Sequence, residues 1–221
     1  MPGLSRAVLL WLFERLLAAY GPQEWWPADS PFEVMTGAVL TQNTAWTNVE
    51  KALKNLKANQ ALDPLVITGS ADETLAGWLR PSGYFNVKAR RLKAFCSWYL
   101  QEGGEEALGR LDTPELRSRI LAVHGIGPET ADDILLYAFD RPVFVIDAYT
   151  RRLLDRMALP GGDLPYEQLR IALEKALGPD LALYNEFHAL IVIHGKERCR
   201  VKPRCHGCPL INRCLMPKMP R

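Results

Sequence analysis

The sequence predicts an all-α fold, and three observations lead to this prediction. Apolar residues recur at helical spacing along most of the 221-residue chain, residue pairs typical of helix starts precede several of these stripes, and glycine and proline fall mostly between them. No internal repeat or low-complexity segment interrupts the pattern. The hydrophobic content of 48% is enough to bury a sizeable core, in one domain or in two small ones.

The helical stripes and their starts can be placed along the chain. The first stripe consists of Val8, Leu9, Leu12, Phe13, Leu16 and Leu17, and similar stripes occupy residues 32–53, 92–99, 134–139 and 181–193. Ser30-Pro31-Phe32-Glu33 combines an N-cap, a proline at the first helical position and a capping-box glutamate, and Thr113-Pro114-Glu115 repeats the cap and the proline. The β-branched run at 143–146 is compatible with a strand in isolation, but no second run lies near enough to pair with it.

Charge and hydropathy restrict the location and the partners. No run of about 18 uncharged apolar residues occurs, and Glu14 and Arg15 interrupt the apolar stretch at 7–20, so we expect neither a membrane span nor a signal peptide. The expectation is an intracellular, cytoplasmic protein. A net charge of +2 does not by itself imply a polyanionic partner. The segment 196–221 is locally strongly basic, with Glu197 as its one acidic residue; its basic residues are Lys196, Arg198, Arg200, Lys202, Arg204, Arg213, Lys218 and Arg221.

Four of the five cysteines gather near the C-terminus, separated by five, two and five residues: Cys199, Cys205, Cys208 and Cys214. Disulfides are not expected in an intracellular chain, which leaves metal or cluster ligation. One Cys-x-x-Cys flanked by wider gaps favours an iron-sulfur cube over a zinc site, which usually pairs two such motifs. With four thiolates available, His194 and His206 are not needed as zinc ligands. Cys96 lies on an apolar stripe and is interpreted as a buried hydrophobe.

Gly125 and Gly127 stand one residue apart, directly before a helix that Pro128 opens. This arrangement predicts an anion site, because the glycines let the backbone approach a phosphate, and the helix start supplies N–H groups and a positive dipole end. An ordinary tight turn between two helices has the same pattern and remains the alternative.

Three segments resemble the helix-hairpin-helix and Gly/Pro-plus-Asp motifs of endonuclease III-type DNA glycosylases. They are residues 121–131, the segment that ends in Asp147, and the basic helix at 151–156. The four cysteines stand where that family keeps a 4Fe-4S cluster. Segments 31–33, 40–42 and 83–89 are also similar to family segments, so the resemblance spans nearly the whole chain. The family usually has six residues between the first two cysteines and this chain has five, so we expect a differently shaped loop or a less stable cluster.

The resemblance implies two helical domains with double-stranded DNA in the cleft between them. Residues 31–141 would form a six-helix barrel-type domain with the helix-hairpin-helix, and 1–30 with 142–221 the iron-sulfur domain. It also implies a monomer that acts in base excision repair, associates with the nucleoid and has no membrane partner. Gln42 and Tyr84 match the positions that insert into the duplex, and Gly125, Gly127, Arg152, Lys202 and Arg204 would contact phosphates. A solvated basic face is the alternative for the cations.

Two carboxylates match catalytic positions of the family. Asp147 would stabilise the oxocarbenium-like sugar or orient the attacking water, and the apolar run before it would desolvate its carboxylate. An N-cap role for Asp147 is compatible with this one. Glu129 stands where family members that cut the backbone have an imine-forming lysine, and a carboxylate cannot form an imine. The sequence therefore resembles the monofunctional branch, although Lys88 or another lysine remains a candidate nucleophile.

Within that branch, residues 41–46 and 24–27 resemble 3-methyladenine DNA glycosylase III. Trp25 and Trp46, with Trp26 as the more structural member, would bind the extruded base. The resemblance thus implies a monofunctional glycosylase that excises alkylated purines. One alternative is a bifunctional glycosylase-lyase for oxidised pyrimidines, or a mismatch thymine or uracil glycosylase. Another is a non-catalytic iron-sulfur module that binds DNA.

Overall fold

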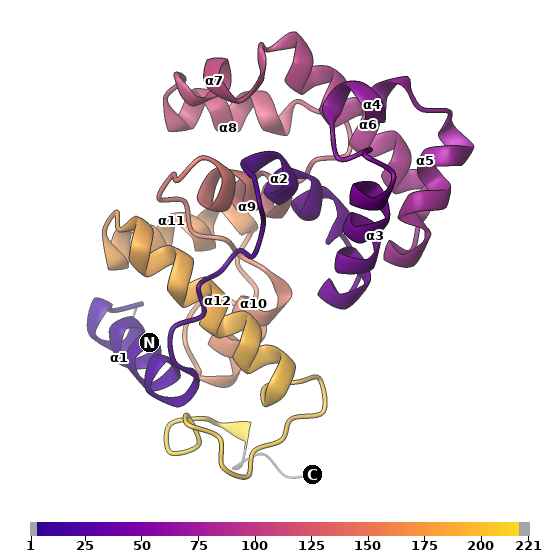
Figure 1. Ribbon diagram of the computed structural model, residues 1–221. Helices are drawn as coiled ribbons and strands as arrows, with labels where there is room; N and C mark the ends of the chain where they lie inside the picture. Colours follow the sequence, from indigo (N-terminus) through magenta and orange to yellow (C-terminus); the bar gives the residue numbers. More distant parts are fainter. Residues whose placement is uncertain (1–3, 217–221) are drawn as a thin grey trace. The chain divides into compact units, whose positions relative to one another are not determined.

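The computed structural model describes residues 4–216, and every regular element in this range is helical (Figure 1). The all-α prediction is therefore confirmed for the described chain. Its contacts divide it into two compact units. The first unit takes the chain up to Trp25 and again from Pro142 onward, and the second is Trp26–Arg141. Residues 26–30 thus belong to the second unit, whereas the sequence analysis assigned them to the domain that contains the N-terminus.

The first unit is built around the long C-terminal helix. Its helix α12 packs against α1 and α10, and α1 also packs against α11 (Figure 1). Leu9, Leu12 and Leu16 of the first stripe are at most 1% exposed, and Phe13 meets Phe187 of α12 edge to face. Each such buried leucine contributes about 1.5 to 3 kcal/mol. The helices of this unit are α1 (Arg6–Tyr20), α10 (Ala148–Arg156), α11 (Tyr166–Leu177) and α12 (Leu181–Glu197).

The second unit surrounds the buried helix α2. This helix packs against α9, α3 and α6, and its side chains are buried from Phe32 through Leu40. The helix α6 in turn packs against α4 and α5, and α8 packs against α9. The helices of this unit are α2 (Pro31–Leu40), α3 (Trp46–Ala58), α4 (Pro64–Gly69), α5 (Asp72–Leu79), η1 (Arg80–Ser82), α6 (Phe85–Gln101), α7 (Gly104–Gly109), α8 (Thr113–Leu121) and α9 (Pro128–Ala138).

The expected helix starts are confirmed in one case and shifted in the other. Ser30 caps α2 as predicted, since its Oγ accepts the N–H of Glu33 at 3.2 Å. The Glu33 carboxylate reaches back one residue further than a capping box requires and accepts the N–H of Asp29. At α8 the prediction of a Thr113 cap is wrong. Asp112 is the N-cap, and its Oδ1 accepts the N–H of Glu115 at 2.8 Å, because a carboxylate is a stronger acceptor than a hydroxyl.

The apolar run at 143–146 is extended and buried but pairs with no strand within residues 4–216. It crosses the core of the first unit, where Phe144 meets Tyr184 and Phe187 edge to face. Directly after this run, Asp147 caps the start of α10. Across residues 4–216 no helix is both long enough and apolar enough to cross a membrane.

Candidate active site

Asp147 begins α10 directly after the buried run, so packing of that run fixes its position. Its Oδ1 accepts the N–H of Thr150 at 2.7 Å, which caps the helix. Asp147 is only 8% exposed. The N-cap role considered from the sequence is thus real, and it leaves the second carboxylate oxygen available for another partner.

That second oxygen faces a histidine that sequence reasoning did not select. Nε2 of His188, on α12, lies 3.7 Å from Oδ2 of Asp147, and His188 is 4% exposed. Burial alone raises the pKa of the Asp147 carboxyl, but His188 and the N–H of Thr150 outweigh burial, so the pKa lies below its ordinary value of 3.8. Asp147 is therefore an ionised carboxylate inside an apolar unit. A polar residue on the otherwise apolar stripe at 181–193 was the one available signal for His188.

The hairpin before α9 has the backbone that an anion site requires. Gly125 has φ +87°, a conformation that glycine adopts without penalty, and Val123 and Ile126 anchor the turn in the core. Gly127 is the N-cap of α9 and no side chain occupies the cap. Glu129 lies in the first turn and is exposed. The start of α9 therefore presents backbone N–H groups and the positive end of the helix dipole.

A hydrogen-bond network of the Gln42 and Arg91 side chains supports the hairpin. Nε2 of Gln42 donates to the carbonyl of Gly125 and to Oγ1 of Thr130, both at 3.1 Å. The guanidinium of Arg91, on α6, donates to Oε1 of Gln42. A Cβ at Gly125 would stand 2.4 Å from Cγ of Arg91. The absence of a side chain at Gly125 thus makes room for Arg91. The sequence alone did not indicate this reason for a glycine at position 125.

Tyr84 is the second residue expected to enter the duplex. It is 71% exposed and adopts φ +48°, following Gly83 at φ +69°. The ring therefore stands exposed at the turn that precedes α6. Gln42, in contrast, is partly buried and hydrogen-bonds to the carbonyl of Gly125 in the hairpin.

Aromatic rings gather in the second unit around the start of α3. Trp26 meets Trp46 edge to face with ring centroids 4.9 Å apart, and it meets Tyr137 of α9 at 5.3 Å. A Cβ at Gly37 would lie 3.2 Å from Trp26 and 3.5 Å from Trp46, so this glycine lets both indoles approach α2. Sequence reasoning selected both tryptophans but missed Tyr137 and Gly37, because only the packing of α2, α3 and α9 brings them together.

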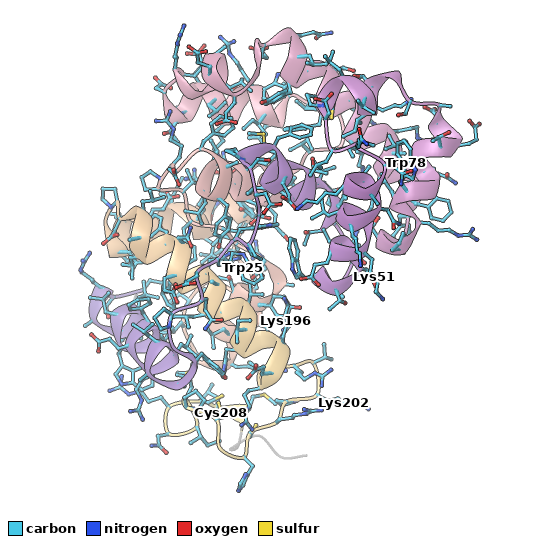
Figure 2. All side chains as sticks on the ribbon, viewed as in Figure 1. Trp25, Lys51, Trp78, Lys196, Lys202 and Cys208 are labelled. Atoms are coloured by element: carbon cyan, nitrogen blue, oxygen red, sulfur yellow. The ribbon has the colours of Figure 1, made fainter. Side chains whose placement is uncertain are left out.

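Trp25 belongs to the first unit. Nζ of Lys196 lies 5.3 Å from the centroid of the Trp25 ring, and both residues are labelled in Figure 2. A cation held over an indole face indicates an electron-rich surface that accepts positive charge.

The four cysteines of the C-terminal loop line one pocket, together with His194, apolar side chains and three arginines, which are Arg156, Arg198 and Arg204. Cys208 and Lys202 mark this loop in Figure 2. Nη1 of Arg156 donates to Sγ of Cys199 at 3.2 Å. Within residues 4–216 no three His, Cys, Asp or Glu side chains are grouped closely enough to hold a single metal ion. The donor set of four thiols around one pocket nevertheless fits an iron-sulfur cluster.

The basic residues differ in their availability. Arg152 donates from Nε to the carbonyl of Cys199 at 2.7 Å and lies over the ring of Tyr149, so it supports the cysteine loop. Lys202 and Arg204 are exposed on that loop. The last two basic residues of the predicted tail, Lys218 and Arg221, lie outside the described residues.

Several known proteins are similar to this chain. Residues 36–179 match the model of the HhH-GPD superfamily base excision DNA repair proteins. A Methanocaldococcus jannaschii protein assigned as a DNA repair glycosylase is 44% identical, over 92% of this chain and 94% of its own length. Endonuclease III of Thermotoga maritima is 29% identical, over 83% of this chain and 82% of its own length.

Solved structures show the same fold. The H. pylori 3-methyladenine DNA glycosylase bound to 1,N6-ethenoadenine is similar with a TM-score of 0.76 and 32% identity, covering 87% of this chain and 97% of that one. An endonuclease III in a non-covalent complex with DNA has a TM-score of 0.83 at 21% identity, covering 97% of each chain, and this likeness concerns the fold.

Proposed function

Because the chain belongs to the HhH-GPD superfamily of base excision DNA repair proteins and is a DNA glycosylase, we propose that it excises alkylated purines, chiefly 3-methyladenine, by hydrolysis without cutting the strand. The observation that carries this proposal is the aromatic cluster of Trp26, Trp46 and Tyr137.

Duplex DNA is the proposed substrate, and the start of α9 is the proposed phosphate site. The N-cap of α9 is a glycine with no side chain, and a Cβ at Gly127 would have no atom within 4 Å. A phosphate can therefore reach the backbone N–H groups, which bind it without reading sequence. Lys202 and Arg204 would add contacts that make binding sensitive to salt.

The base would be bound by aromatic stacking. A 3-alkylated adenine is cationic, and its glycosidic bond is already weakened, so it needs recognition more than acid assistance. An electron-rich indole such as that of Trp46 would bind a cationic ring by stacking and cation-π attraction, which together contribute about 1 to 2 kcal/mol. The solved H. pylori structure, at 32% identity, holds an etheno-modified adenine, which supports a purine as ligand.

Asp147 would act on the sugar. Positive charge develops on the sugar as the bond to the base breaks, and a preorganised carboxylate in a desolvated site stabilises that charge strongly. The structure keeps this carboxylate ionised, with His188 at its second oxygen. The same carboxylate is suited to orient the attacking water.

Hydrolysis without strand cleavage is supported by the chemistry of Glu129 and by the burial of Lys88. The residue at the imine-forming position is Glu129, whose carboxylate cannot attack the sugar as an amine does. Lys88, the alternative nucleophile, is 1% exposed, and its ammonium is bound to two backbone carbonyls. Neither residue supplies an accessible amine.

The four cysteines would hold a 4Fe-4S cluster, which when bound would supply a rigid framework for the basic loop that bears Lys202 and Arg204. Arg152 and Arg156 tie that loop to α10 through Cys199 and its neighbours, and α10 begins with Asp147. The loop and the proposed catalytic aspartate thus belong to one connected structure within the first unit.

The proposal is tested by the bases that the protein releases from DNA treated with a methylating agent. Chromatography should identify 3-methyladenine as the main product, and Trp46→Leu should lower its release about 10-fold, as expected for the loss of one stacking contact of 1 to 2 kcal/mol. Trp98→Leu is the matched control, since Trp98 is also half-buried but packs on Phe95 of its own helix. Absence of any released alkylpurine would overturn the proposal, and DNA binding without release would favour a non-catalytic module.

A further inference from the structure

The helix α6 carries a lysine whose side chain is fully enclosed. Lys88 is 1% exposed, and its Nζ donates to the carbonyl of Leu40 at 2.9 Å and to the carbonyl of Ser82 at 2.6 Å. Both partners are backbone carbonyls and neither is a carboxylate. Burial, with Arg91 as a nearby second cation, lowers the pKa of Lys88 to about 8. Burying an ammonium without a counter-ion costs free energy that an apolar side chain would not.

The two carbonyls stand at equivalent points of two loops. Leu40 is the last residue of α2 and lies two residues before Gln42, whereas Ser82 is the last residue of η1 and lies two residues before Tyr84. One ammonium therefore joins the backbones that lead to both residues expected to enter the duplex. The backbone N–H of Lys88 also donates to the carbonyl of Tyr84, at 3.0 Å.

The Tyr84 turn needs such support. Its ring is exposed, so side-chain packing does not hold the turn, and both Gly83 and Tyr84 have positive φ. A non-glycine residue in this region costs about 1 to 2 kcal/mol. One turn further along α6, Arg91 holds the side chain of Gln42. The same helix thus fixes the backbone of both loops through Lys88 and the orientation of one side chain through Arg91.

We propose that Lys88 is a positioning residue that fixes the spacing between the Gln42 loop and the Tyr84 turn, so that both side chains enter the same gap in a duplex. This inference rests on the proposed function only in requiring that the chain bind a duplex with a displaced nucleotide. It does not depend on which base is excised.

The experiment measures selectivity for a gap. Dissociation constants are determined for a duplex with a tetrahydrofuran abasic analogue and for the intact duplex, and their ratio is compared between variants. Lys88→Met should reduce the wild-type preference for the abasic duplex about 10-fold, equivalent to 1.4 kcal/mol. Lys93→Met is the matched control, because Lys93 lies on the same helix and binds the carbonyl of Ser70 with Asp72, away from both loops. Its ratio should equal that of the wild type.

A mutant cycle separates positioning from general damage. In a Gln42→Ala/Tyr84→Ala background, Lys88→Met should change the ratio by less than about 2-fold, because residues that act through one another are not additive. A loss of equal size in both backgrounds would overturn the inference, as would an unchanged ratio in Lys88→Met.

If Lys88→Met does not fold, Lys88→Gln carries the same cycle, since it keeps two N–H donors without the charge. Its loss of abasic preference should again vanish in the background that lacks both inserting side chains. A wild-type protein with no abasic preference would also overturn the inference. A wild type that prefers the abasic duplex but releases no alkylpurine would leave the inference standing and would reject the proposed substrate.

Discussion

Replacing Asp147 separates the two roles that the structure gives to one carboxylate. Oδ1 caps α10 through the N–H of Thr150, and Oδ2 faces His188. Asparagine keeps an acceptor for the cap but removes the charge, whereas alanine removes both. Asp147→Asn should therefore stay within about 1 kcal/mol of the wild type in stability, because Asn and Asp are equivalent N-caps, and Asp147→Ala should be less stable than Asp147→Asn by about 1 kcal/mol.

Activity should follow a different order. Loss of a preorganised charge at the developing cation is expected to slow base release about 100- to 1000-fold, equivalent to 2.7 to 4 kcal/mol, in both variants alike. Single-turnover release of the base measures the chemical step, and urea unfolding measures stability. Asp180→Ala is the control, because Asp180 caps α12 in the same unit through the N–H of Leu183. It should lose stability and keep its activity.

Two results would refute this reasoning. If Asp147→Asn retained more than about a tenth of the wild-type rate, the charge would not be what stabilises the reaction. If Asp147→Ala were as stable as Asp147→Asn, the cap would not contribute to folding.

Three further predictions follow from the hairpin, the cysteine loop and the pKa of Asp147. Gly125→Ala should lose about 1 to 3 kcal/mol of stability because of its positive φ and the contact with Arg91, whereas Gly127→Ala, with open space at its Cβ, should keep its stability and weaken DNA binding; urea unfolding and fluorescence anisotropy measure the two effects. Cys208→Ala should lower the content of bound iron and sulfide, measured by elemental analysis, and should lower the denaturant concentration at which the first unit unfolds. A full iron content would show that Cys208 is not a ligand. Because the pKa of Asp147 is depressed in the folded state, its stabilisation is present above pH 3.8 and is lost as the pH falls through the folded pKa; the unfolding free energy of the wild type, measured with urea at successive pH values, should therefore fall toward that of Asp147→Asn as the pH drops below 3.8.

The helical fold and the positions of several candidate site residues were predictable from the sequence because their signals are local. The Ser30-Pro31 start, the glycines of the hairpin and the apolar run before Asp147 are patterns of adjacent residues, and the structure confirms the helix, the turn and the buried run. The four cysteines were found in the same way, and the structure places them around one pocket.

The supporting residues were not predictable, because their contacts join distant parts of the chain. Gln42 donates hydrogen bonds to Gly125 and Thr130, which follow it by 83 and 88 positions in the sequence. His188 meets Asp147 only because α12 packs on α10. Tyr137 and Lys88 likewise have no local pattern that distinguishes them from ordinary helix residues. Their roles follow from tertiary packing, which single-sequence periodicity does not contain.

We propose that this glycosylase removes an alkylated purine and leaves the strand intact. The most direct test uses two defined duplexes, one with 3-methyladenine and one with thymine glycol, and scores strand breaks before and after hot alkali. We expect release of methyladenine, with breaks that appear only after alkali. Removal of thymine glycol with breaks before alkali would contradict it and would identify a glycosylase-lyase for oxidised pyrimidines.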